Sequence, residues 1–170
     1  MKCVDLVSPY FQEDYQFEVG MNLNGKVVSV ELSAIVHATE NVEKVKTAIL
    51  NLLPPATHDS IAFTRTYVRG HYGNPIVVFS TKVEKEKLAR MIVEHLFSIM
   101  EPNTKEELTL ILDKSMDEDG NFYIRLDKNE ALRRRIKLTS RDPIRVKIGI
   151  RMWRPALNIA RSALKDLGLV

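Results

Sequence analysis

The stretch VVSVELSAIVHA, residues 27–38, decides the fold together with the residues that follow it. Its apolar side chains fall close to every second position, which is the period of a strand with one buried face. We therefore predict a strand here, and expect these residues to point into the core: Val28, Val30, Leu32 and Val36.

A helix is predicted directly after this strand. In residues 40–53 the apolar residues recur at helical spacing, and Pro54 and Pro55 stop the pattern. Thr39 precedes the first turn and is expected to cap it, because a threonine hydroxyl can accept a hydrogen bond from a free backbone amide there.

The rest of the chain alternates between strands and helices without strict β–α order. Residues 61–70 and 75–83 flank GHYGNP and predict a β-hairpin, while 122–127 and 143–152 predict two further strands. Residues 85–100 predict a helix whose buried face consists of Leu88, Met91, Ile92, His95, Leu96 and Ile99. This arrangement favours an α+β fold over a doubly wound parallel sheet.

The length and composition favour one intracellular domain. Residues 1–24 show no clean period and are interpreted as an N-terminal extension, with residues 25–170 forming a single α+β domain. No apolar run reaches the length of a membrane span, and acidic residues near the N-terminus argue against export. Cys3 is the only cysteine, which fits a reducing cytoplasm.

The net charge of +3 conceals an asymmetric distribution. Residues 1–120 carry 12 Lys/Arg against 18 Asp/Glu, whereas residues 121–170 carry 13 against 4. A basic segment of this density indicates a polyanionic partner such as nucleic acid. The alternative is that the basic side chains only solvate one face of the protein.

The two predicted strands in this basic segment place cations and an aromatic ring on one face. By the two-residue period, these residues point away from the apolar side: Tyr123, Arg125, Arg145, Lys147 and Arg151. Cations neutralise phosphates, and aromatic rings stack on unpaired bases, so the face suits RNA. Exposed strand faces are generally polar, which would explain polar side chains here but not that the charges at 145, 147 and 151 are all positive.

Two further groups are candidate RNA contacts. Arg133, Arg134 and Arg135 form a compact cluster that would suit phosphate binding, and the alternative is an exposed connection. His71 and Tyr72 lie at the expected hairpin tip, where they could contact RNA in addition to forming a tight turn.

No motif indicates catalysis or a cofactor. The four histidines lack metal-ligand spacing, and the chain has no phosphate-binding or dinucleotide-binding loop. Residues 117–120, DEDG, partly match a calcium loop, but two essential ligand positions are wrong, so an acidic turn is the better interpretation. A hydrolase using Asp117, Glu118 and Asp119 with a divalent metal is a remote alternative.

Five strings in order resemble an archaeal family known as predicted exosome subunits or RNA-binding proteins. They are HATENVEKV (37–45), AILNLLP (48–54), GHYGNPI (70–76), FYIRLDK (122–128) and DPIRVKI (142–148). The resemblance implies a fold similar to the ribosomal protein that binds 5S rRNA, with helices on one face of a mixed, largely antiparallel sheet.

The resemblance also implies a non-catalytic RNA-binding protein of RNA processing or exosome-mediated decay. The expected partners are RNA, either rRNA or processing substrates, and exosome subunits. The alternative function is a protein–protein adaptor or a homo-oligomeric scaffold, a homodimer in its simplest form, whose basic face meets an acidic partner.

Overall fold

A five-stranded sheet organises the chain, whose computed structural model describes residues 25–69, 75–153 and 156–169. The spatial order is β2-β3-β1-β5-β4, so β1 is central while β2 and β4 are the edges. All pairings among these strands are antiparallel, which confirms the expected α+β class and a largely antiparallel sheet. The strands are β1 (Lys26–Val36), β2 (Thr64–Arg69), β3 (Pro75–Val83), β4 (Asn121–Asp127) and β5 (Pro143–Arg151).

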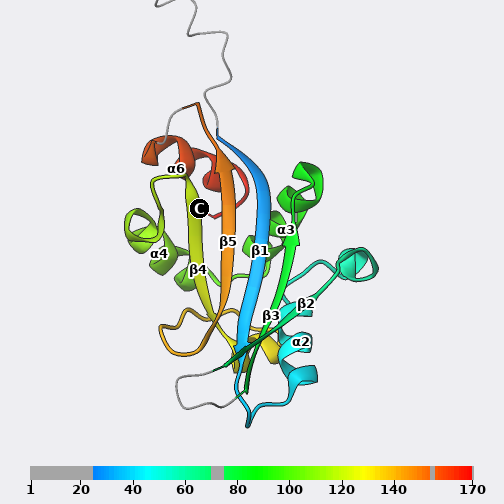
Figure 1. Ribbon diagram of the computed structural model, residues 1–170. Coiled ribbons are helices and arrows are strands. Elements are labelled where there is room, and N and C mark those ends of the chain that lie inside the picture. Colours follow the sequence, from blue (N-terminus) through cyan, green and yellow to red (C-terminus); the bar gives the residue numbers. More distant parts are fainter. Residues whose placement is uncertain (1–24, 70–74, 154–155, 170) are drawn as a thin grey trace, which may run out of the picture.

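Helices pack against one face of this sheet, and Figure 1 shows the opposite face of the strands without a covering helix. One apolar core fills the space between the sheet and the helices. The helices are α2 (Val42–Leu50), α3 (Glu86–Ser98), α4 (Pro102–Ile111), α5 (Lys128–Leu132) and α6 (Leu157–Asp166), with 3₁₀ turns η3 (Pro55–Ser60) and η4 (Leu112–Ser115). Within the described ranges, no helix has both the length and the apolar character needed to cross a membrane.

A β-bulge near the start of β1 changes which valine enters the core. The register of β1 against β5 shifts between Val27 and Ser29. Val27 is consequently buried, whereas Val28 is only partly buried, so the prediction for Val28 is wrong. A bulge inserts one extra residue into a strand, and a simple two-residue period does not anticipate it.

The N-cap of α2 is Asn41, and the prediction of Thr39 is wrong by two positions. The Asn41 side-chain oxygen accepts hydrogen bonds from the backbone amides of Glu43 at 2.9 Å and Lys44 at 3.2 Å. Asparagine caps a helix at least as well as threonine, because its carbonyl oxygen reaches the same free amides. The helix therefore begins at Val42.

The buried face of α3 is rotated relative to the predicted one. Its buried residues are Ala89, Ile92, Val93, Leu96 and Phe97, and α3 packs against the central strand β1. Met91 and Ile99, which were expected in the core, are 41% and 36% exposed. Two overlapping apolar stripes on this helix both satisfy helical spacing, so periodicity alone could not select between them.

Replacing Gly120 by alanine should lower the free energy of unfolding by about 2–3 kcal/mol, because two penalties combine. Gly120 has a φ of +82°, and an added Cβ would lie 2.9 Å from the Ile150 carbonyl oxygen. Gly168 is the matched control: its φ is +92°, but nothing lies within 4 Å of an added Cβ. Chemical denaturation should show a smaller loss for Gly168→Ala, and equal losses would show that the contact with Ile150 contributes nothing.

Candidate functional site

Four side chains meet on the helix-free face of the sheet, where β4 and β5 pair. Tyr123 lies opposite Lys147, and Arg125 lies opposite Arg145, in the antiparallel register of these two strands. The apolar residues between them point the other way and are buried. We refer to Tyr123, Arg125, Arg145 and Lys147 as the outer-face quartet. The structure thus brings together four of the five residues that the sequence placed on one face, and the fifth, Arg151, pairs with Glu86 instead.

The charges of the quartet are not balanced by close acidic partners. None of Arg125, Arg145 and Lys147 forms a salt bridge within the described part of the chain. Glu31 of β1 is the cross-strand neighbour of Lys147, without reaching salt-bridge distance. Like charges directly opposite each other on a sheet repel. The juxtaposed pair Arg125 and Arg145 therefore favours an anion bound from outside.

Tyr123 is held in place by its hydroxyl and by two cations beside its ring. The Arg145 guanidinium carbon lies 6.0 Å and the Lys147 Nζ lies 5.8 Å from the ring centroid. The hydroxyl donates a hydrogen bond of 2.8 Å to Asp117. Burial and then the bond to Asp117 raise the pKa of Tyr123, so the phenol stays neutral and remains a donor.

In the acidic turn at 117–120, the Asp117 carboxylate is already hydrogen-bonded to neighbouring residues. Burial works against ionisation of Asp117, but hydrogen bonds from Asn121, Tyr123 and the Asp119 amide outweigh it and lower the pKa of Asp117. Its carboxylate accepts from the Asn121 side chain at 2.9 and 3.1 Å. Asp117, Glu118 and Asp119 do not gather into a metal-binding group among the described residues. The turn therefore positions Tyr123, and nothing in its geometry favours the hydrolase alternative.

Unlike the quartet, Arg151 and two residues of the arginine cluster form salt bridges with glutamates. Arg151 binds Glu86 of α3 at 2.9 Å. Arg133 and Arg135 both bind Glu130, at 3.1 and 2.7 Å. The helix α5, which precedes the cluster, packs against α2 on the helix side of the sheet. The structure therefore does not bring this cluster into the outer-face quartet, and Arg133 and Arg135 already have an acidic partner.

The remaining candidate residues are His71, Tyr72 and the exposed Trp153. His71 and Tyr72 lie outside the described residues. Trp153 follows β5 and is 72% exposed.

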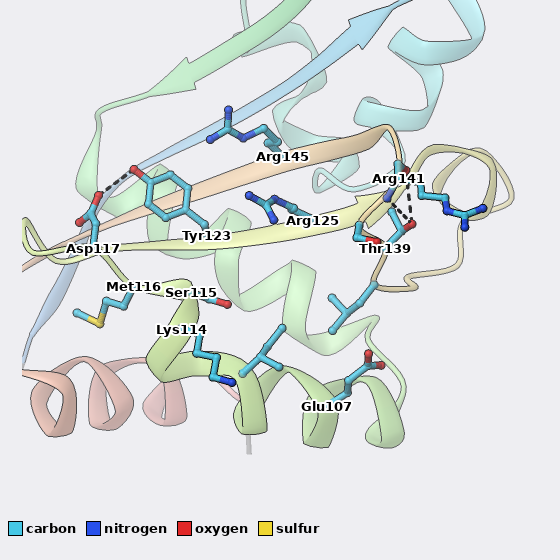
Figure 2. Close-up of a pocket in the computed structure, with 13 residues that line it drawn as sticks. Glu107, Lys114, Ser115, Met116, Asp117, Tyr123, Arg125, Thr139, Arg141 and Arg145 are labelled. Carbon is cyan, nitrogen blue, oxygen red and sulfur yellow. Dashed lines mark hydrogen bonds between the residues drawn. The ribbon is translucent and has the colours of Figure 1, made fainter.

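A cleft of about 810 Å³ lies beside the quartet, between the free edge of β4 and the helix α4 with its continuation η4. Figure 2 shows Tyr123, Arg125 and Arg145 on the sheet side of this cleft, with Glu107 and Lys114 on the helix side. Sequence reasoning missed the cleft, because its two walls come from separate parts of the chain. Other residues that line it are Ile111, Ser115, Met116, Asp117, Leu138, Thr139, Ser140 and Arg141.

A buried lysine joins three elements at the far end of the sheet. The Lys128 ammonium lies 3.0 Å from Glu40 and 2.7 Å from Asp142, and it also donates to the Ile35 carbonyl. His37 is 3.2 Å from the same Asp142. His37, Glu40 and Asp142 are close enough together to hold a metal ion. However, the ammonium already balances the two carboxylates, so we interpret this Lys128 cluster as a structural ion network.

Comparisons with known proteins agree on one family. A family model described as RNA binding matches residues 29–150. The RNA-binding protein PAB1135 of Pyrococcus abyssi is 29% identical over 127 residues, covering 74% of this chain and 82% of that protein. The uncharacterized protein MJ0213 of Methanocaldococcus jannaschii is 35% identical over 105 residues, covering 61% and 70%. The crystal structure of protein AF2318 from Archaeoglobus fulgidus, of DUF54, has a TM-score of 0.72 at 29% identity, covering 84% of this chain and 99% of that chain.

Proposed function

Because this chain belongs to the RNA-binding family, we propose that it binds RNA on the helix-free face of its sheet, through the outer-face quartet. One observation carries the proposal: Arg125 and Arg145 face each other across two strands without an acidic partner among the described residues. A phosphate between two guanidinium groups would replace their repulsion with charge-assisted hydrogen bonds.

The aromatic member of the quartet supports single-stranded RNA as the ligand. The Tyr123 ring is fixed by its bond to Asp117 and lies beside Arg145 and Lys147. A fixed ring among cations offers a stacking surface for a base next to sites for its phosphates. The role proposed for this surface is binding, and no covalent step is assigned to it.

The finer proposal places this binding in cytoplasmic RNA processing or exosome-mediated decay, which rests on the sequence resemblance alone. Copurification from native extract tests it, with ribonuclease treatment of half the sample. Exosome subunits that stay bound after the treatment support a direct association, whereas subunits lost with the RNA, or never recovered, argue against one.

Reversing the two β5 charges, with Arg145→Glu and Lys147→Glu combined, should weaken RNA binding at least tenfold. Each lost phosphate contact should also reduce the slope of log affinity against log salt by about 0.7. Both side chains point away from the core, so the melting temperature should not fall. Fluorescence anisotropy with labelled oligouridylate across a salt series measures both quantities.

The matched control carries the same charge reversal elsewhere. Lys85 and Lys87 are exposed, stand at the same spacing, and lie at the start of α3. Lys85→Glu with Lys87→Glu should leave most of the affinity intact. If the β5 variant kept wild-type affinity, the proposed surface would be wrong. Self-association without any RNA binding would instead favour the homo-oligomeric scaffold.

A further inference from the structure

The edge of β4 that borders the cleft presents backbone groups toward it. The Asp117 amide donates to the Asn121 carbonyl, and the Thr139 amide donates to the Arg125 carbonyl, both at 3.0 Å. Odd-numbered residues of β4 therefore direct their backbone groups away from β5. The same alternation directs the carbonyl of Tyr123 and the amide of Arg125 into the cleft, while the Tyr123 amide faces Ser115 across the bridge between Met116 and Phe122. No hydrogen bond satisfies the Tyr123 carbonyl or the Arg125 amide within the described ranges.

The open part of this edge is too short to receive another strand. Met116 bridges to Phe122 at one end, and Leu138 bridges to Leu126 at the other. Only the stretch from Tyr123 to Arg125 remains between them. A peptide that adds to a sheet edge usually pairs along several residues. A single planar group with adjacent donor and acceptor atoms fits the opening better.

The cleft is predominantly cationic, and part of its lining is apolar. Four basic side chains line it, against the acidic Glu107 and Asp117, and Asp117 is already bonded to Tyr123 and Asn121. Ile111 contributes apolar surface from the helix side, opposite the strand edge. Figure 2 shows Arg125 and Arg145 at the sheet side and Arg141 at one end. These basic side chains are Lys114, Arg125, Arg141 and Arg145.

We propose that this cleft holds one unpaired nucleotide of the bound RNA, with the edge of its base hydrogen-bonded to the backbone of Tyr123 and Arg125. The inference rests on the proposed function and adds a preference to it. Every base carries a donor and an acceptor side by side on its Watson–Crick edge, and base pairing uses both. The cleft therefore selects single strands over duplexes, without selecting a sequence.

The cation arrangement is consistent with this occupant. A nucleotide seated in the cleft would place its flanking phosphates at the mouth, where Arg145 belongs to both the cleft and the outer-face quartet. The RNA strand would then run from the quartet into the cleft without a break in positive charge.

Filling the cleft tests the inference with a matched pair of substitutions. Ile111→Trp places a large ring inside the cleft, whereas Leu110→Trp places it on the neighbouring residue, which is 84% exposed and does not line the cleft. The wild type and Leu110→Trp should bind oligouridylate more tightly than an RNA duplex of equal length. Ile111→Trp should lose roughly tenfold in affinity for oligouridylate and keep its affinity for the duplex.

A second measurement does not depend on any variant. Uridine monophosphate added to the labelled wild-type protein should shift the backbone amide resonance of Arg125 in the NMR spectrum. If the wild type binds no RNA, the proposed function fails and this inference fails with it. If RNA binds but this amide does not respond, or if folded Ile111→Trp keeps its preference for single strands, only the cleft inference is overturned. If Ile111→Trp does not fold, the amide titration decides.

Discussion

Replacing Lys128 by methionine should lower the free energy of unfolding by about 2–4 kcal/mol, because it leaves two carboxylates and a carbonyl without their shared donor. Lys128 is 7% exposed and contacts Glu40, Asp142 and the Ile35 carbonyl. The loss should fall below the largest values for buried charges, since Glu40 and Asp142 retain 29% and 41% of their side-chain exposure and can regain water.

Lys87 provides the control for this substitution. It is exposed in the first turn of α3, and it forms no salt bridge with any described residue. Lys87→Met removes the same charge and adds the same side chain, and it should change the free energy of unfolding by less than about 0.5 kcal/mol. Urea denaturation measures both variants. Similar values for the two would show that the Lys128 cluster does not stabilise the fold.

Replacing Phe122 by alanine should lower the free energy of unfolding by about 3–5 kcal/mol, since Phe122 is completely buried in the core. The protein that remains folded should bind RNA with wild-type affinity, because Phe122 points away from the outer-face quartet. Thermal or urea denaturation measures the loss of stability, and RNA titration at low temperature measures the affinity of the folded fraction.

Tyr123, the next residue of β4, points to the opposite face of the sheet, so the opposite effects are expected. Tyr123→Ala should cost less stability than Phe122→Ala, because the ring is only half-buried, but it should weaken RNA binding severalfold through lost stacking. If Phe122→Ala weakened binding by the folded protein while Tyr123→Ala did not, the assignment of the two faces of β4 would be wrong.

The two-residue period predicted the face of β4 and β5 correctly, because both strands have regular alternation and one buried side. It failed at Val28, where a bulge shifts the register, and the helical period failed at Met91, where two apolar stripes overlap. The relationship to the RNA-binding family is confirmed. A likeness to the ribosomal protein that binds 5S rRNA stays a prediction.

Sequence reasoning could not predict the features of the site that depend on contacts between residues far apart in the chain or on salt bridges. The three consecutive arginines Arg133 to Arg135 predicted a phosphate-binding site. In the structure, Glu130 of the preceding helix α5 forms salt bridges with Arg133 and Arg135. Ile111 of α4 and Arg125 of β4 line opposite sides of the cleft. No local sequence pattern predicts that two residues so far apart in the chain will face each other. Ile111 in fact has the apolar spacing of a core residue, yet it is 39% exposed.

The order of strands in the sheet determines when the sheet can form during synthesis on the ribosome. The central strand β1 is synthesised first, but one of its two neighbours, β5, is more than 100 residues later in the chain. A ribosome must therefore release nearly the whole domain before the sheet can close, and pairings this distant in sequence form slowly. The quartet and the cleft both depend on β5, so a nascent or truncated chain that lacks β5 has neither, and under the proposed function it should not bind RNA.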